Sequence, residues 1–313
     1  MSKQSLIEQL DQAIDRMIAD PDAQALSADA SLLDLLRVAQ DLRDLPRPDF
    51  KATLRSNLER NASMSTKTVV FRPGFRTVTP YLLPPNSEFI DFIKTVFGAE
   101  ETERTMTSAS SFHAEVRIGD SMLMIGVGSP RSMPAALHVY VPNADEVYQR
   151  ALDGGAVSLN PMIEDHGDRF GCVQDAAGNQ WYISTHLAGH YIPEHLHTVT
   201  SYFHPVGTGK FIDFLKQAFG AQEIARYDSP AGEVLHAKIR IGDSVLEAGE
   251  PHGWWQPMPA MMYLYVPDVD AVYDQAIRAG ADSIHPPADQ PYGDRNGGVT
   301  DAWGNQWYMA TPL

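Results

Sequence analysis

The sequence predicts an α+β protein in which two tandem copies of one unit follow a helical segment. Three observations support this prediction: blocks of sequence recur in the same order, each copy alternates between strand and helix periodicity, and the first 72 residues show helical spacing alone. The expected domains are a helical extension over 1–72, a first α+β domain over 73–190 and a second over 191–313.

Four blocks of sequence occur twice. The block that starts at Thr77 returns at Thr198, 121 residues later, and the block that starts at Asp175 returns at Asp301, 126 residues later. Between them, HAEVRIGDSMLMIG shares nine of fourteen residues with HAKIRIGDSVLEAG, and VYVPNADEVYQRALDGGA returns as LYVPDVDAVYDQAIRAGA. Chance does not place four matched blocks in one order, so the pattern indicates an internal duplication.

The first half of each copy reads as a strand, a helix and a hairpin. In the first copy, a strand over 77–83 ends at a Pro-Pro pair, and a helix over 88–97 has apolar residues at helical spacing. Asn86 or Ser87 can cap this helix, and a glycine ends it. Strands over 112–118 and 121–125 follow, joined by a Gly-Asp turn.

The second half of each copy repeats this plan. In the first copy we expect a strand over 136–141, a helix over 144–154, and strands near Val157, over 170–174 and over 180–184. The order is therefore β-α-β-β-β, twice in each copy and four times in the chain.

The residues before the first copy differ from the rest. Segments 5–19, 27–42 and 49–64 each show amphipathic helical spacing with a plausible capping residue at the start. We expect two or three helices that pack on the first domain or on a partner subunit of a homodimer. A regulatory or partner-binding arm is the alternative interpretation.

Composition excludes several classes of function. The formal net charge is −16 and no cluster of Lys and Arg is present, which argues against a nucleic-acid partner. No stretch has the roughly 18 consecutive apolar residues of a membrane span. The chain opens without the apolar run of a signal peptide, and its single cysteine, Cys172, cannot form an internal disulfide. These features predict a cytoplasmic protein.

The repeated motifs resemble those of a known superfamily. Each copy contains His-Ala-x-h-Arg-Ile-Gly-Asp-Ser-h-Leu (h, apolar), then Tyr-Val-Pro-Asn/Asp, Gly-Asp-Arg and Asp-x-x-Gly-Asn-Gln-Trp. This order resembles the vicinal oxygen chelate superfamily, which includes glyoxalase I, extradiol dioxygenases and bleomycin-resistance proteins, and within it the PhnB-like branch. The resemblance implies two glyoxalase/bleomycin-resistance-type domains, each of paired βαβββ modules that curve around an open pocket, with the helices outside.

The resemblance also implies where a divalent metal would bind. The superfamily's enzymes take His, Glu or Gln ligands from four inward strand positions. These fall near Val78 or Thr79, Val199 or Thr200, and at Met124, Glu247, Ala136, Met261, Tyr182 and Tyr308. Glu247 is the only metal-ligating type at an expected position, whereas a metal needs three or four donors. The sequence therefore predicts no metal cofactor, although a divalent metal stays possible.

Two features leave room for a metal site. His138 lies two residues beyond Ala136 and so on the same face of its strand, where a small shift of the alignment would make it a ligand. Units from different copies could also pair, which would bring Glu247 and His138 together.

Other polar residues are candidates for the pocket. His113 and His236 begin the repeated hairpin and could act as general bases, or they could be structural hydrogen-bonding residues. Arg169 and Arg295 could bind a substrate carboxylate, or each could pair with the aspartate that precedes it.

Aromatic residues complete the candidate set. Tyr182 and Tyr308 should line the pocket, whereas the tryptophan before each should lie in the core. Trp254 and Trp255 could form one wall of a ligand site or a domain interface. We expect Cys172 to be a packing residue.

The combined interpretation is a protein that binds a small organic molecule in an open pocket without a catalytic metal, with the better site in the second copy. No catalytic residue is assigned. One alternative is a metal-dependent lyase, isomerase or dioxygenase built on Glu247. Another is a scaffold that only mediates assembly through its N-terminal helices.

Overall fold

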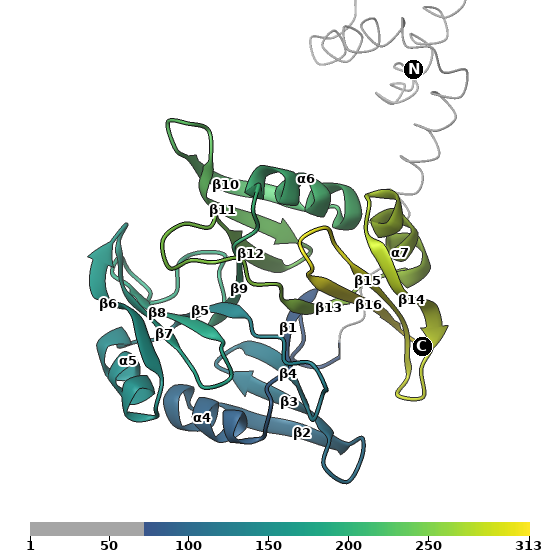
Figure 1. Ribbon diagram of the computed structural model, residues 1–313, viewed down its shortest axis with the longest axis horizontal. Helices are drawn as coiled ribbons and strands as arrows, with labels where there is room; N and C mark the ends of the chain where they lie inside the picture. The colour runs from purple at the N-terminus through teal and green to yellow at the C-terminus, as the bar shows by residue number, and fades with distance from the viewer. Residues whose placement is uncertain (1–71) are drawn as a thin grey trace, which may run out of the picture. The chain divides into compact units, whose positions relative to one another are not determined.

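The computed structural model describes residues 72–313, which form four consecutive β-α-β-β-β units (Figure 1). The first unit contains β1 (Val78–Leu82), α4 (Glu88–Phe97), β2 (Glu100–Met106), β3 (Phe112–Ile118) and β4 (Ser121–Val127). The second contains β5 (Ala136–Tyr140), α5 (Ala144–Asp153), β6 (Val157–Asp165), β7 (Asp168–Gln174) and β8 (Gln180–His186). The helices predicted within 1–72 lie outside the described residues.

The third and fourth units repeat the same order. The third contains β9 (Val199–Phe203), α6 (Thr208–Phe219), β10 (Gln222–Asp228), β11 (Val234–Ile241) and β12 (Ser244–Ala248). The fourth contains β13 (Met261–Tyr265), α7 (Val269–Arg278), β14 (Asp282–Asp289), β15 (Asp294–Thr300) and β16 (Gln306–Pro312). The predicted α+β class and the fourfold β-α-β-β-β order are both confirmed.

The sixteen strands form two sheets of eight. Sheet A has the order β14-β15-β16-β13-β1-β4-β3-β2, and sheet C has the order β10-β11-β12-β9-β5-β8-β7-β6. Sheet A therefore joins the first unit to the fourth, and sheet C joins the second to the third. In sheet C the central strands β5 and β9 run antiparallel, with Ala136 opposite Tyr202. Each copy therefore contributes strands to both sheets, and the copy boundary expected at 190–191 does not separate one sheet from the other.

The helices bind each copy together through a core of aromatic side chains. Trp181 is fully buried on β8, where it stacks with Phe89 and packs at a tilt on Phe97. Both phenylalanines lie on α4, which belongs to the same copy but to the unit whose strands are in the other sheet. Trp307 has the same relation to Phe219 in the second copy. The prediction that both tryptophans face the helices is confirmed. Each copy thus shares a core while it contributes to both sheets.

The helix ends follow from local sequence. Gly98 ends α4 in the left-handed conformation, with φ of 66°, and its N–H donates to carbonyls of the last turn. The Asn143 side chain caps α5 by accepting a hydrogen bond from the N–H of Glu146. Ser87 is the cap residue of α4 but its side chain makes no capping bond; instead Asn86 Oδ1 accepts from the N–H of Glu88.

The repeated motif Asp-x-x-Gly-Asn-Gln-Trp forms a structural loop. Asp175 accepts hydrogen bonds from the backbone N–H groups of Ala177 and Asn179, from the Asn179 amide and from the Trp181 indole. The second copy repeats these contacts around Asp301. The motif is therefore explained by folding.

Strand β2 was implied by the β-α-β-β-β order, but no residues were assigned to it. Its sequence, EETERTM, has no apolar alternation, and six of its seven residues are exposed. It is an edge strand of sheet A, held by backbone pairing to β3. Its polarity is typical of an edge strand, which hydrophobic periodicity does not detect.

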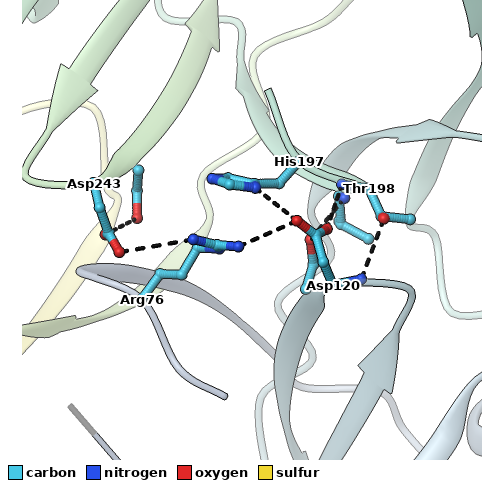
Figure 2. Close-up of polar contacts among 8 residues, drawn as sticks. Arg76, Asp120, His197, Thr198 and Asp243 are labelled. Carbon is cyan, nitrogen blue, oxygen red and sulfur yellow. Dashed lines mark hydrogen bonds and ion pairs between the residues drawn. The ribbon is translucent and has the colours of Figure 1, made fainter. Parts of the chain in front are cut away.

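Reciprocal contacts join the two sheets at their centres (Figure 2). Asp120, in the turn between β3 and β4, accepts a hydrogen bond from the N–H of Thr198, where β9 begins. Asp243, in the matching turn of the other copy, accepts from the N–H of Thr77. Arg76 extends between the two carboxylates, 3.1 Å from Asp120 Oδ2 and 3.8 Å from Asp243 Oδ2.

Candidate functional site

The concave face of sheet A encloses a cavity of about 570 Å³, called here the open cavity. Its residues come from the first unit, with Arg72 just before β1, and from β13 to β16 of the fourth unit, so neither copy builds it alone. The lining contains five tyrosines: Tyr81, Tyr263, Tyr265, Tyr292 and Tyr308. It also contains Arg72, Glu103, Thr105, Thr107, His113, Glu115, Met124, Met261, His285, Gln290, Asp294 and Asn296.

One end of the cavity carries a buried ionic group. Glu115 is 4% exposed, and its Oε1 lies 2.5 Å from Arg72 Nη1 without the alignment of a hydrogen bond. Arg72 also contacts Glu103 at 3.1 Å. The Tyr265 hydroxyl is buried beside Arg72 without an aligned hydrogen bond; burial raises its pKa above the ordinary value, and the guanidinium offsets part of that rise. Two buried oxygens at this end are therefore compensated by the charge of Arg72 but lack an aligned hydrogen bond, which a bound group could supply.

The fourth unit supplies the second acidic position. Asp294 is 5% exposed at the start of β15, and the Tyr263 hydroxyl donates a 2.8 Å hydrogen bond to its Oδ2. Burial is the main cause of the raised pKa of Tyr263, and the Asp294 carboxylate raises it further. Tyr263 is therefore a phenol that donates to Asp294.

The hairpin histidine lies in this cavity as predicted. His113 Nδ1 is 3.3 Å from the Tyr81 hydroxyl, and the two rings stack. Burial raises the pKa of Tyr81 to about 12. His113 and Glu115 line the cavity, whereas Ala114 between them is buried, so the predicted alternation of this strand is confirmed.

The equivalent face of sheet C, called here the filled face, is covered by its own chain. Trp254 and Trp255, from the loop between β12 and β13, pack with Met258 over a cluster formed by Ala136, Cys172 and Tyr182. The Trp254 ring is 5.9 Å from the Tyr182 ring and 4.6 Å from the Trp255 ring. The tryptophan pair thus contacts candidate pocket residues and occupies their concave side.

A buried polar chain lies within the filled face. Glu247 is 1% exposed, and His138 Nδ1 lies 2.8 Å from its Oε2. The other ring nitrogen of His138 is 2.7 Å from Ser184 Oγ. Burial alone would raise the pKa of Glu247, but the charge and hydrogen bond of His138 hold it below the usual range. The pairing of units from different copies, foreseen as the route that brings His138 to Glu247, is confirmed.

His236 lies at the edge of this group. Its Nε2 is 3.6 Å from Glu247 Oε1, and its Nδ1 is 3.1 Å from the Tyr202 hydroxyl. Burial lowers the pKa of His236, which favours the neutral imidazole.

Comparison with known proteins identifies the family. The family model described as the Glyoxalase/Bleomycin resistance protein/Dioxygenase superfamily matches residues 208–309. An uncharacterized protein of Mycobacterium bovis is 34% identical over 113 residues, which are 33% of this chain and 74% of that protein. A Mycobacterium tuberculosis protein, also uncharacterized, has the same identity over 66% of its length. The chain belongs to the glyoxalase/bleomycin resistance protein/dioxygenase superfamily.

Solved structures of the superfamily share the fold. Glyoxalase I from Zea mays superposes with a TM-score of 0.57 at 12% identity, over 75% of this chain and 92% of that one. A putative dioxygenase from Bacillus subtilis gives a TM-score of 0.51 at 11% identity, over 75% and 84%. Identities this low show a common architecture only.

The metal implied by the superfamily does not fit the residues present. Within 72–313, no group of three or more His, Cys, Asp or Glu side chains is placed to hold a metal ion. One ring nitrogen of His138 contacts Glu247 and the other contacts Ser184. Neither nitrogen is therefore free to bind a metal ion. In the open cavity the equivalent positions carry Met124 and Tyr263, which are poor donors for a divalent cation.

The two arginine candidates lie away from both concave faces. Arg169 binds Asp145 at the start of α5, and Arg295 binds Asp270 at the start of α7 in two-pronged contacts. Arg295 also contacts Asp289. Neither arginine lines the open cavity, and neither pairs with the aspartate before it. The alternative in which each arginine pairs with the aspartate before it is therefore wrong: these side chains connect β7 to α5 and β15 to α7.

Cys172 behaves as a core residue. It is fully buried in the filled face, and burial raises the pKa of its thiol well above the ordinary value. A thiol held neutral in this way is a poor nucleophile, which agrees with the predicted packing role. No helix within the described range is long and apolar enough to cross a membrane.

Several cavity residues were not predicted as such. Arg72 lies before the repeat. Tyr265 is on a strand whose sequence does not show which side chains face the helices and which face the cavity. Asp294 was considered only as a partner of Arg295. A usable signal was available for Asp294, because it shares its side of the sheet with Asn296, two residues later on β15, and with Tyr308 on the neighbouring strand β16.

Proposed function

We propose that the protein binds a small organic molecule in the open cavity and does so without a catalytic metal. The supporting observation is the cavity itself: about 570 Å³ of space with aromatic walls and a few convergent polar groups. This volume and this lining are typical of small-molecule sites. The proposal moves the better site away from the second copy alone, since the cavity needs the first and fourth units together.

The polar groups are placed to orient a ligand. Glu115 and Asp294 are nearly buried carboxylates, and Tyr265 carries a buried hydroxyl without an aligned hydrogen bond. Hydrogen bonds from a bound molecule would satisfy these groups and fix its direction, while the tyrosine rings supply contact area. Binding of this kind needs no ion to hold the ligand.

A crystallographic soak tests the proposal. Crystals exposed to a library of small aromatic fragments should show fragments gathered in the open cavity. Met124→Trp, which places an indole on the cavity floor, should abolish this occupancy, whereas His252→Ala on the exposed outer loop should leave it unchanged. Fragments scattered over the surface, with none in the cavity of the unaltered protein, would contradict the proposal.

The alternative is a metal-dependent lyase, isomerase or dioxygenase. One observation favours it: Glu247 lies 2.8 Å from His138 and 3.6 Å from His236, so three side chains of metal-ligating type are neighbours, although they do not converge on one point as placed. Metal analysis of protein purified without chelator separates the two functions. Stoichiometric Zn, Ni, Mn or Fe that is lost in Glu247→Gln and kept in Glu115→Gln would favour the enzyme.

We also propose the finer assignments that the motifs suggest. The repeated hairpin and the Asp-x-x-Gly-Asn-Gln-Trp loops support placement in the PhnB-like branch and an origin by tandem duplication.

A further inference from the structure

We infer that the ligand of the open cavity carries a cationic nitrogen, and that Asp294 binds it. This inference rests on the proposed function and adds the chemical class of the ligand: an aromatic or otherwise apolar amine. The supporting observations are the surroundings of Asp294 and their comparison with those of Asp168, the equivalent carboxylate in the other sheet.

Asp294 is a nearly buried anion without a cationic partner. It is 5% exposed, it lines the open cavity, and its one side-chain neighbour in hydrogen-bond contact is the neutral Tyr263 hydroxyl. Among residues 72–313, no Lys, Arg or His forms an ion pair with it. Buried charges in proteins are ordinarily paired, because removal of a carboxylate from water is costly.

The matched residue in sheet C shows the missing partner. Asp168 begins β7 as Asp294 begins β15, and each accepts a hydrogen bond from a tyrosine. The donor is Tyr140 in sheet C and Tyr263 in sheet A, which lies two residues before Tyr265, the equivalent of Tyr140. Asp168 also contacts His186 Nδ1 at 2.6 Å, from the directly opposite position on β8.

In sheet A the residue opposite Asp294 is Pro312. Proline has no side-chain nitrogen that could donate to a carboxylate. The same fold position is therefore satisfied within the protein in sheet C and faces the cavity without a cation in sheet A.

The charge of the whole cavity favours the same ligand. Three carboxylates line it, those of Glu103, Glu115 and Asp294, against a single guanidinium, that of Arg72. Arg72 contacts the two glutamates and so leaves Asp294 uncompensated. Its carboxylates outnumber its guanidinium, so the lining attracts a cation and repels a carboxylate.

The walls favour an aromatic body for this cation. Tyr263, Tyr292 and Tyr308 line the cavity together with Asp294, and aromatic faces attract both apolar rings and cationic groups. At the far end, Glu115 Oε1 can accept a further hydrogen bond, and so can the Tyr265 oxygen. An amine with additional N–H or O–H donors would satisfy both ends.

Three indoles of nearly equal shape test the charge requirement by calorimetry. Tryptamine is a cation at neutral pH, indole-3-ethanol is neutral and indole-3-propionate is an anion. Tryptamine should bind at least tenfold more tightly than the alcohol, and the propionate should bind most weakly. Asp294→Asn should weaken tryptamine at least tenfold and leave the alcohol within about twofold. Asp168→Asn, the matched change in the filled face, should leave tryptamine binding unchanged.

A second variant supplies the partner from within. Pro312→His places an imidazole opposite Asp294, as His186 stands opposite Asp168, and should weaken tryptamine more than the alcohol at pH 6. Equal affinity for the three indoles, or an unchanged tryptamine affinity in Asp294→Asn, would overturn the inference. If fragments occupy the cavity in the soak while tryptamine shows no preference over its alcohol, the proposed function stands and the cationic ligand is wrong.

Discussion

The open cavity and the filled face occupy the same place on two sheets of the same strand order, yet their inward positions differ. Where the filled face has Glu247 and His138 in contact, the open cavity has Met124 and Tyr263. The filled face satisfies its ionic groups with one another and is covered by a tryptophan pair. The open cavity keeps its space and two buried oxygens without an aligned hydrogen bond, and one ring nitrogen of His204 is in the same state beside the filled face. The two faces therefore differ most in free space and in the partner of one carboxylate, because Asp168 contacts His186 whereas Asp294 has no cation beside it within 72–313.

The largest expected effect comes from the ionic group of the filled face. Glu247→Met gives this face the residue found at the equivalent position of the open cavity. It should lower the free energy of unfolding by about 3 kcal/mol or more, because it removes one partner of a buried charged pair. Denaturant unfolding at pH 7 measures this change.

A double variant sharpens this comparison. Glu247→Met with His138→Tyr reproduces the pair of residues found in the open cavity, so it should be more stable than Glu247→Met alone. Met124→Leu, which alters the open cavity without a charge, should cost less than about 1.5 kcal/mol. If Glu247→Met matched Met124→Leu, the ionic group would have no structural role.

The second prediction concerns pH. His204 is 4% exposed beside the filled face, and burial lowers its pKa from 6.5 to about 4. Between these values the unfolded chain takes up a proton that the folded protein does not, so the unfolding free energy falls as pH decreases from 6.5 to 4. The contribution at stake is on the order of 3 kcal/mol.

Leucine occupies the equivalent position of the first copy, as Leu83, and gives a matched control. His204→Leu should lose the part of the acid sensitivity that this imidazole causes, measured as unfolding free energy at pH 7 and pH 4.5. The same slope in variant and parent would show that other groups govern acid stability.

The third prediction tests whether the tryptophan pair closes the filled face. Trp254→Ala with Trp255→Ala should lower the unfolding free energy by about 2 kcal/mol, since both rings are half-buried. It should also uncover a second concave face, so that an apolar dye such as anilinonaphthalene sulfonate binds with increased stoichiometry. Unchanged dye binding would mean that Met258 and the surrounding loop close this face without the tryptophans.

Sequence reasoning predicted the unit and its repetition because local signals specify both. Helix α4 was predicted over the residues that form it, since Phe89 and Ile93 recur at helical spacing and Gly98 ends the run. Strand β2 was implied by the unit order but assigned no residues, because an exposed edge strand carries no apolar alternation. Such signals describe elements along the chain.

The candidate site was predicted less well because it depends on which units pair. From the sequence we expected the two units of one copy to form a sheet together, with pairing of units from different copies as the alternative. The observed strand order shows the alternative. His113 and Tyr308 were assigned to a pocket and lie in one. For Arg169 and Arg295 the wrong aspartate was expected as partner, because strand alternation gives two faces without saying which one meets a helix.

The smallest expected effect lies at the junction of the sheets, where the two copies differ by one residue. Arg76 and His197 hold equivalent positions before β1 and β9; Arg76 reaches both Asp120 and Asp243, whereas His197 contacts Asp120 at 2.7 Å.

Arg76→His makes the junction symmetric. Its contacts are half-exposed ion pairs, so the unfolding free energy should change by less than about 1 kcal/mol, with the difference reduced in 1 M salt. Backbone hydrogen bonds to Asp120 and Asp243 would still join the sheets. A loss of 3 kcal/mol in unfolding free energy would instead show that Arg76 is the main contact between the sheets, even though its buried Nε makes no hydrogen bond.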